Sequence, residues 1–76
     1  MKAAGRQGED DTAVYLREVT LIANPAQLRV LAQFISEAAA ELETSSDLFE
    51  HRHWRDCWPD WREDYVDVIV HNANRQ

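Results

Sequence analysis

A helix-start signal, Asn24-Pro25-Ala26-Gln27, is the feature that most narrows what this chain can fold into. Asn24 can cap a helix through its side-chain oxygen, and Pro25 suits the first helical position, where its missing N–H costs nothing. Gln27 stands at the third position, as in a capping box. Behind this signal, apolar residues recur on one helical stripe: Leu28, Leu31, Ala32, Ile35, Ala38, Ala39 and Leu42. The pattern predicts one amphipathic helix from residue 25 to near residue 43, with Val30 and Phe34 on a flank toward solvent.

Strand-like segments lie on both sides of this helix. Residues 13–23 are rich in β-branched and aromatic side chains, with apolar residues on both faces, so we expect a strand that is covered at least partly on both sides. Residues 48–54 and residues 65–72 alternate as two further strands. Residues 55–64, which contain Pro59, are interpreted as a structured loop between them.

The order strand, helix, strand, strand predicts an α+β fold. We expect a three-stranded mixed sheet (β-α-β-β) with one helix packed on one face, in which the first two strands form a right-handed parallel crossover. The last two strands would pair as an antiparallel hairpin. Residues 13–72 would form the single domain, residues 1–12 a disordered N-terminal arm and residues 73–76 a polar tail. One helix leaves the second sheet face uncovered, which makes that face a candidate interface.

The charge and the cysteine count exclude several classes of partner and compartment. The formal net charge is −6, whereas nucleic acids and anionic membrane surfaces attract basic patches, so we expect neither as a partner. No apolar run approaches the ~20 residues of a membrane span. Cys57 is the single cysteine, so the chain has no internal disulfide, which fits a reducing, cytoplasmic location.

Catalysis is not expected. A 76-residue chain leaves little room for a deep pocket, and both glycines lie in the N-terminal arm, so there is no glycine-rich phosphate loop. Cys57 with a histidine would be the minimum for a thiol nucleophile, but nothing near it supplies an oxyanion site. We therefore predict a non-catalytic protein that needs no cofactor.

The region from residue 47 to residue 67 is the most unusual part of the chain. It holds all three tryptophans, and its seven acids against three arginines account for −4 of the net −6. The candidate partner-binding residues all lie here: Trp54, Trp58, Trp61, Asp56, Asp60, Glu63, Asp64, His51 and His53. Tryptophan is enriched at binding hot spots, and a ring of acids suits a basic, partly apolar partner. The alternative is that the tryptophans plug the open end of a small core and the acids are solvated.

His51 and His53 are two residues apart, so both imidazoles would lie on one strand face. With Cys57, Asp56 or His71 they could bind zinc or another transition metal, although no specific metal-binding spacing is present. Structural or interface histidines are the other interpretation. A metal-binding domain through His51 and His53 therefore stays as an alternative, as does a structural homodimer formed through the uncovered sheet face.

Three stretches together resemble the immunity protein 32 family of bacterial polymorphic toxin systems. They are Val19-Thr20-Leu21-Ile22-Ala23-Asn24-Pro25, His51-x-His53-Trp54 and Val68-Ile69-Val70, and the resemblance covers about residues 14–72. It implies a small protein that binds and neutralises a cognate toxin and has no catalysis of its own. An acidic surface fits that role if the toxin is basic, since opposite charges speed association. The leading hypothesis is thus an immunity-like inhibitor of a basic protein.

Overall fold

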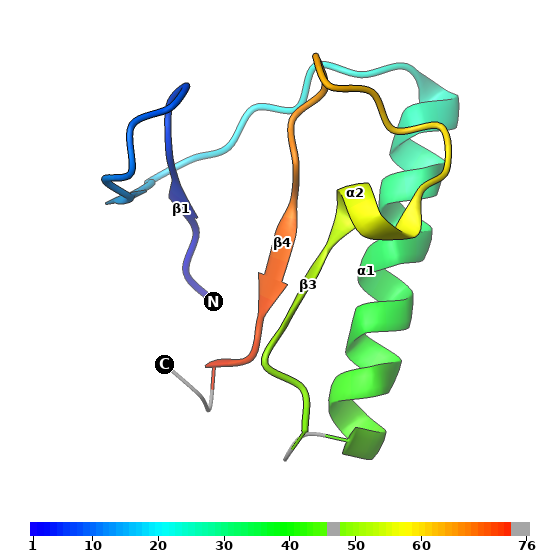
Figure 1. The fold of residues 1–76 in the computed structure, drawn as a ribbon. Helices are drawn as coiled ribbons and strands as arrows, with labels where there is room; N and C mark the ends of the chain where they lie inside the picture. Colours follow the sequence, from blue (N-terminus) through cyan, green and yellow to red (C-terminus); the bar gives the residue numbers. More distant parts are fainter. Residues whose placement is uncertain (46–47, 74–76) are drawn as a thin grey trace.

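The computed structural model describes residues 1–45 and 48–73 as one long helix beside short strands. In chain order the elements are β1 (Ala4–Gly5), β2 (Val14–Tyr15), α1 (Pro25–Ser45), β3 (His51–His53), α2 (Trp54–Cys57) and β4 (Ile69–His71). Helix α1 runs alongside the β3–β4 hairpin, and the β1–β2 pair lies beyond β4, away from α1 (Figure 1). The α+β class is confirmed.

The predicted helix is confirmed, and its N-terminal cap is a capping box. The backbone N–H of Gln27 donates to Asn24 Oδ1 at 2.8 Å, and the backbone N–H of Asn24 donates to Gln27 Oε1 at 3.0 Å. These reciprocal bonds satisfy donors that a helix start would otherwise leave unpaired. Helix α1 ends at Ser45, and of the turn expected after it, residues 46 and 47 lie outside the described residues.

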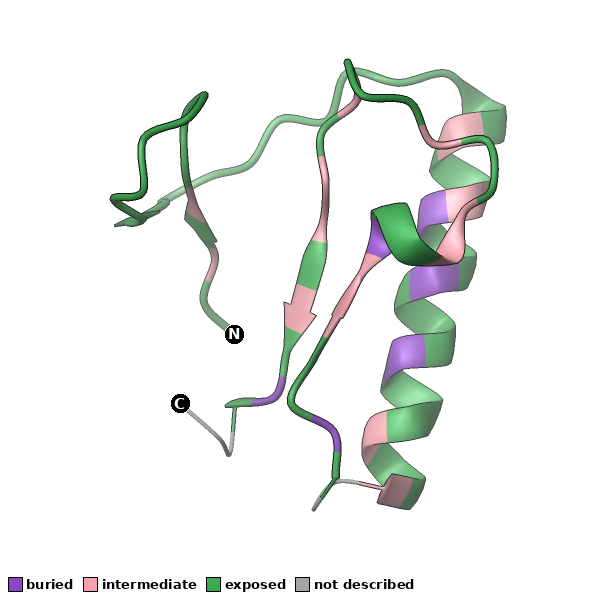
Figure 2. Cartoon of the chain, viewed as in Figure 1, coloured by how far each residue is buried: buried purple, intermediate pink, exposed green. Residues whose placement is uncertain are grey.

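The buried face of α1 differs from the predicted stripe. Leu31, Phe34 and Ala38 are buried, whereas Leu28 and Ile35 are 42% and 49% exposed. Phe34, expected on the flank toward solvent, is 3% exposed, so that prediction was wrong. The reason is the position of its packing partner, because Leu31 and Phe34 form one buried cluster with Trp54. Figure 2 shows buried residues on the side of α1 that faces the hairpin and none in the β1–β2 region.

The predicted three-stranded mixed sheet is also wrong. The described residues contain two two-stranded sheets, β1 with β2 and β3 with β4, both antiparallel. Of the strand expected over 13–23, only Val14–Tyr15 pairs, and it pairs with Ala4–Gly5 instead of joining the C-terminal strands, so no parallel crossover forms. Gly5 suits this pairing, because a Cβ there would lie 3.2 Å from Leu16 Cδ1.

Two further segments differ in detail from what we expected. The segment predicted to be a disordered arm contains β1, and the domain boundary at residue 13 stays a prediction. The predicted loop after β3 begins with one turn of helix, α2. Of the predicted polar tail, only Ala73 lies within the described residues.

The expected antiparallel hairpin of the last two strands is confirmed. Its register pairs His51 with His71, Arg52 with Val70 and His53 with Ile69. Arg52 contacts acids of α1, and Val70 packs against the buried cluster, so this face of the hairpin is turned toward the helix. Because side chains alternate along a strand, His51, His53, Ile69 and His71 lie on the other face, which we call the outer face.

Candidate functional site

The three tryptophans lie in one cluster at the end of the hairpin near α2. Trp54 is 6% exposed and stacks on Trp58 with ring centroids 4.9 Å apart, and Trp58 stacks on Tyr65 at 5.6 Å. Trp61 Nε1 donates to Val66 O at 3.1 Å. Trp58 and Trp61 are only partly buried. The tryptophan cluster (Trp54, Trp58, Trp61 and Tyr65) therefore has a core member and an accessible edge, and partner binding through that edge stays a prediction.

The predicted acids lie in the same loop as Trp58 and Trp61. Asp56, Asp60, Glu63 and Asp64 are all exposed on the acidic loop, which we define as residues 55–64. Asp64 lies 3.4 Å from Arg62, and Asp56 lies 3.8 Å from Arg55. Exposed pairs of this kind contribute little to stability, typically about 0–1 kcal/mol. The carboxylates are thus accessible to an external cation beside partly exposed indoles.

His51 and His53 belong to a different surface. They lie on the outer face of the hairpin with ring centroids 5.2 Å apart, and His71 stacks on His51 at 6.0 Å. His53 Nδ1 lies 2.6 Å from Asp67 Oδ2. The structure therefore brings the predicted tryptophans and acids together but places the predicted histidines in a second group.

Asp67 links the two groups, and sequence reasoning did not single it out. Besides contacting His53, it accepts a hydrogen bond from the backbone N–H of Arg55 at 3.0 Å through Oδ1. The side chain is mostly buried, with 18% exposure, unlike the acids of the loop. Its only sequence signal was its position in the alternating segment 65–72, where a charged residue interrupts a run of apolar ones.

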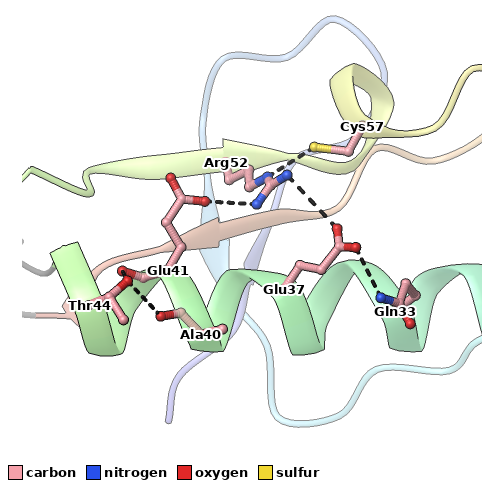
Figure 3. Close-up of polar contacts among 7 residues, drawn as sticks. All are labelled: Gln33, Glu37, Ala40, Glu41, Thr44, Arg52 and Cys57. Atoms are coloured by element: carbon pink, nitrogen blue, oxygen red, sulfur yellow. Dashed lines mark hydrogen bonds and ion pairs between the residues drawn. The ribbon is translucent and has the colours of Figure 1, made fainter.

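A polar network around Arg52, also missed from the sequence, joins α1, β3 and α2 (Figure 3). The guanidinium contacts Glu41 Oε2 through Nη1 at 2.7 Å and Glu37 Oε2 through Nη2 at 4.0 Å. Its Nε donates to Cys57 Sγ at 3.0 Å. The hydrogen bond to Cys57, supported by the charges of Glu41 and Glu37, raises the pKa of Arg52. The network uses the only thiol as a structural acceptor, which does not make it a nucleophilic centre.

The described residues were also searched for membrane-spanning helices and for groups of metal-binding side chains. None of their helices is both long and apolar enough to cross a bilayer. In the same ranges, no group of three or more His, Cys, Asp or Glu side chains is placed so that it could hold a metal ion.

Comparison with known proteins identifies the family. The family model described as Immunity protein 32 matches residues 18–73. The match covers α1, the β3–β4 hairpin, the tryptophan cluster and the acidic loop, and it leaves out β1 and β2. No curated protein and no solved structure matches the chain. The resemblance expected from the sequence is confirmed, and this chain belongs to the immunity protein 32 family.

Proposed function

We propose that this protein is a cytoplasmic, non-catalytic inhibitor that binds a toxin through the acidic loop and the exposed edge of the tryptophan cluster. Membership of an immunity protein family supports the inhibitor role. The observation that carries the choice of surface is the position of Trp58 and Trp61, half-buried among exposed carboxylates. The rigid packing of Trp58 between Trp54 and Tyr65 limits the side-chain entropy that binding would remove.

The partner that fits this surface is a basic protein with an apolar contact region. Partly buried aromatic residues surrounded by polar ones match the composition of binding hot spots, where water is excluded from a small apolar centre. The four carboxylates of the acidic loop would speed encounter with Lys or Arg side chains and disfavour acidic proteins. Arg62, whose guanidinium lies 5.9 Å from the ring centroid of Tyr65, would remain at the rim.

The test is a comparison of two charge-reversed variants in binding to the cognate toxin, once a pull-down from the native organism has captured it. The first variant carries Asp60→Lys, Glu63→Lys and Asp64→Lys in the acidic loop. The control carries Glu9→Lys, Glu18→Lys and Glu43→Lys, which are exposed and outside the loop, so both variants have the same net charge.

We expect the loop variant to lower the association rate constant at least about tenfold at low salt and to abolish protection of toxin-expressing cells. The control should protect cells and associate within about threefold of the wild-type rate. Equal loss in both variants would mean that net charge alone matters, and unchanged binding in the loop variant would place the interface elsewhere.

A homodimer remains a second proposal for the outer face of the hairpin. Ile69, on that face, is 48% exposed. Sedimentation at micromolar concentration tests this proposal, since a dimer should dissociate on Ile69→Asp, and a wild-type monomer at that concentration would rule it out.

A further inference from the structure

We infer that His51, His53 and His71 form a binding site for a divalent transition-metal ion, such as Zn²⁺ or Ni²⁺, on the outer face of the β3–β4 hairpin. Neutral imidazole is a preferred ligand of these ions. All three histidines of the chain meet on this face, although they come from two strands. The inference does not depend on the proposed inhibitor role, because the acidic loop contributes none of the three ligands.

The strand register places the histidines at the right backbone spacing. The backbone N–H of Trp54 donates to Val68 O, and that of Asn72 donates to Glu50 O, so the hydrogen-bonded pairs of this ladder are the even-numbered residues. His51 and His71 are therefore a non-hydrogen-bonded pair, in which the Cα atoms of an antiparallel ladder approach to about 4.5 Å. His53 follows His51 on the same face, one pleat along the strand.

The side chains are close and accessible. Ring centroids are 5.2 Å apart for His51 and His53 and 6.0 Å apart for His51 and His71. His51 and His71 are exposed, and His53 is partly buried. Arg52 is turned to the opposite face, where it contacts Glu41, whereas Arg55 Nε lies 3.8 Å from Asp67 Oδ2, the oxygen that contacts His53.

Asp67 prepares His53 to be a ligand. The 2.6 Å contact between Asp67 Oδ2 and His53 Nδ1 favours the tautomer that carries its proton on Nδ1, which leaves a lone pair on Nε2. Asp67 is itself held by the backbone N–H of Arg55. A carboxylate that orients a ligating imidazole in this way is the usual outer partner of a metal-bound histidine.

Two rings have to turn before the ligands converge. In the conformation described, His51 and His71 are stacked nearly parallel, at 13°, and no three His, Cys, Asp or Glu side chains of the described residues could hold a metal ion as they are placed. The His71 ring makes one long polar contact within the described residues, a 3.3 Å approach of Nδ1 to Asn72 O. Rotation of two exposed side chains costs little compared with moving the backbone, whose spacing is already fixed by the ladder. Water would complete a tetrahedral Zn²⁺ site.

The experiment titrates untagged, chelator-treated protein with Zn²⁺ and separately with Ni²⁺, measured by calorimetry and by thermal unfolding. We expect one ion per chain and a rise in Tm, because the ion would join β3 to β4 in the folded state only. His51→Ala and His71→Ala should each weaken binding at least about tenfold, and Asp67→Asn about tenfold or more.

Cys57→Ser and Glu50→Gln serve as controls, because each removes another potential metal ligand and leaves the outer-face histidines unchanged. Both should bind metal as the wild type does. Absence of binding at millimolar Zn²⁺ and Ni²⁺, binding that survives His71→Ala, or loss of binding in Cys57→Ser would each overturn the site. Far-UV circular dichroism of the histidine variants, which change exposed residues, separates lost ligands from lost folding.

Discussion

The C-terminal part of this small protein buries apolar side chains in a core, whereas its N-terminal part does not. From Pro25 onward, one helix and one hairpin bury a cluster centred on Leu31, Phe34 and Trp54. Before Pro25, every residue from 6 to 24 is exposed, including apolar ones such as Ile22 at 96%. Strand-forming sequence is present in both parts, but only the C-terminal part has a partner layer against which to pack. Burial, more than intrinsic strand preference, thus decides where this chain has a core.

The largest effect expected from this comparison is at Trp54. Replacing Trp54 by Ala should cost about 3–5 kcal/mol of unfolding free energy, because a large buried side chain leaves a cavity that the surroundings fill only partly. For a domain of this size that is most of its stability. Urea denaturation followed by circular dichroism measures it. A loss below about 1 kcal/mol would show that the core does not depend on this indole.

The capping box of α1 should have the next largest effect. Asn24→Ala removes the acceptor for the Gln27 N–H and should cost about 1 kcal/mol. Asn24→Asp keeps the capping oxygen and is the matched control. Equal destabilisation by the two changes would mean that the hydrogen bond from the Gln27 N–H to the capping oxygen does not contribute to the unfolding free energy.

The link between α1 and β3 should contribute less. Glu41→Gln weakens the 2.7 Å ion pair with Arg52, and because both side chains are partly exposed we expect a loss of about 0.5 kcal/mol. Glu43→Gln is the same change at an exposed position two residues along the helix and should cost nothing measurable. Since the pKa of Arg52 is raised, the guanidinium stays charged at any working pH, so this loss should not vary between pH 6 and pH 9.

The smallest effect is expected in the N-terminal part. Tyr15 is in β2 and 74% exposed, so Tyr15→Ala should change the unfolding free energy by less than about 0.5 kcal/mol. A loss comparable to that of Trp54→Ala would contradict the contrast between the two parts. It would also indicate that residues 14–23 pack in solution against an apolar surface, such as the one at Leu28 and Ile35.

Features set by local chemistry could be predicted from the sequence, and features set by distant contacts could not. Helix α1 followed from a capping box within four residues, and the hairpin from alternation in its two strands. The sheet was wrong because residues 13–23 favour a strand but cannot specify their neighbour. The burial of Phe34 depended on Trp54, twenty positions away along the chain.

The same distinction between local and distant contacts applies to the candidate site. The clustering of tryptophans with acids was visible in the composition, because those residues are also neighbours in sequence. The meeting of His71 with His51 was not, since it depends on a strand register that the loop between the strands does not fix. Asp67 was missed for a related reason, because its importance comes from a contact to His53 across the hairpin.

The position of the tryptophans also gives this protein a built-in optical reporter. All three tryptophans lie in one cluster, two of them within the acidic loop, and β1 and β2 contain none. Tryptophan emission therefore monitors the C-terminal part alone, and a partner that covers Trp58 and Trp61 should shift it to shorter wavelength and shield it from acrylamide. A partner that docks on the N-terminal part should leave the spectrum unchanged, so a single fluorescence titration without a label locates the docking surface.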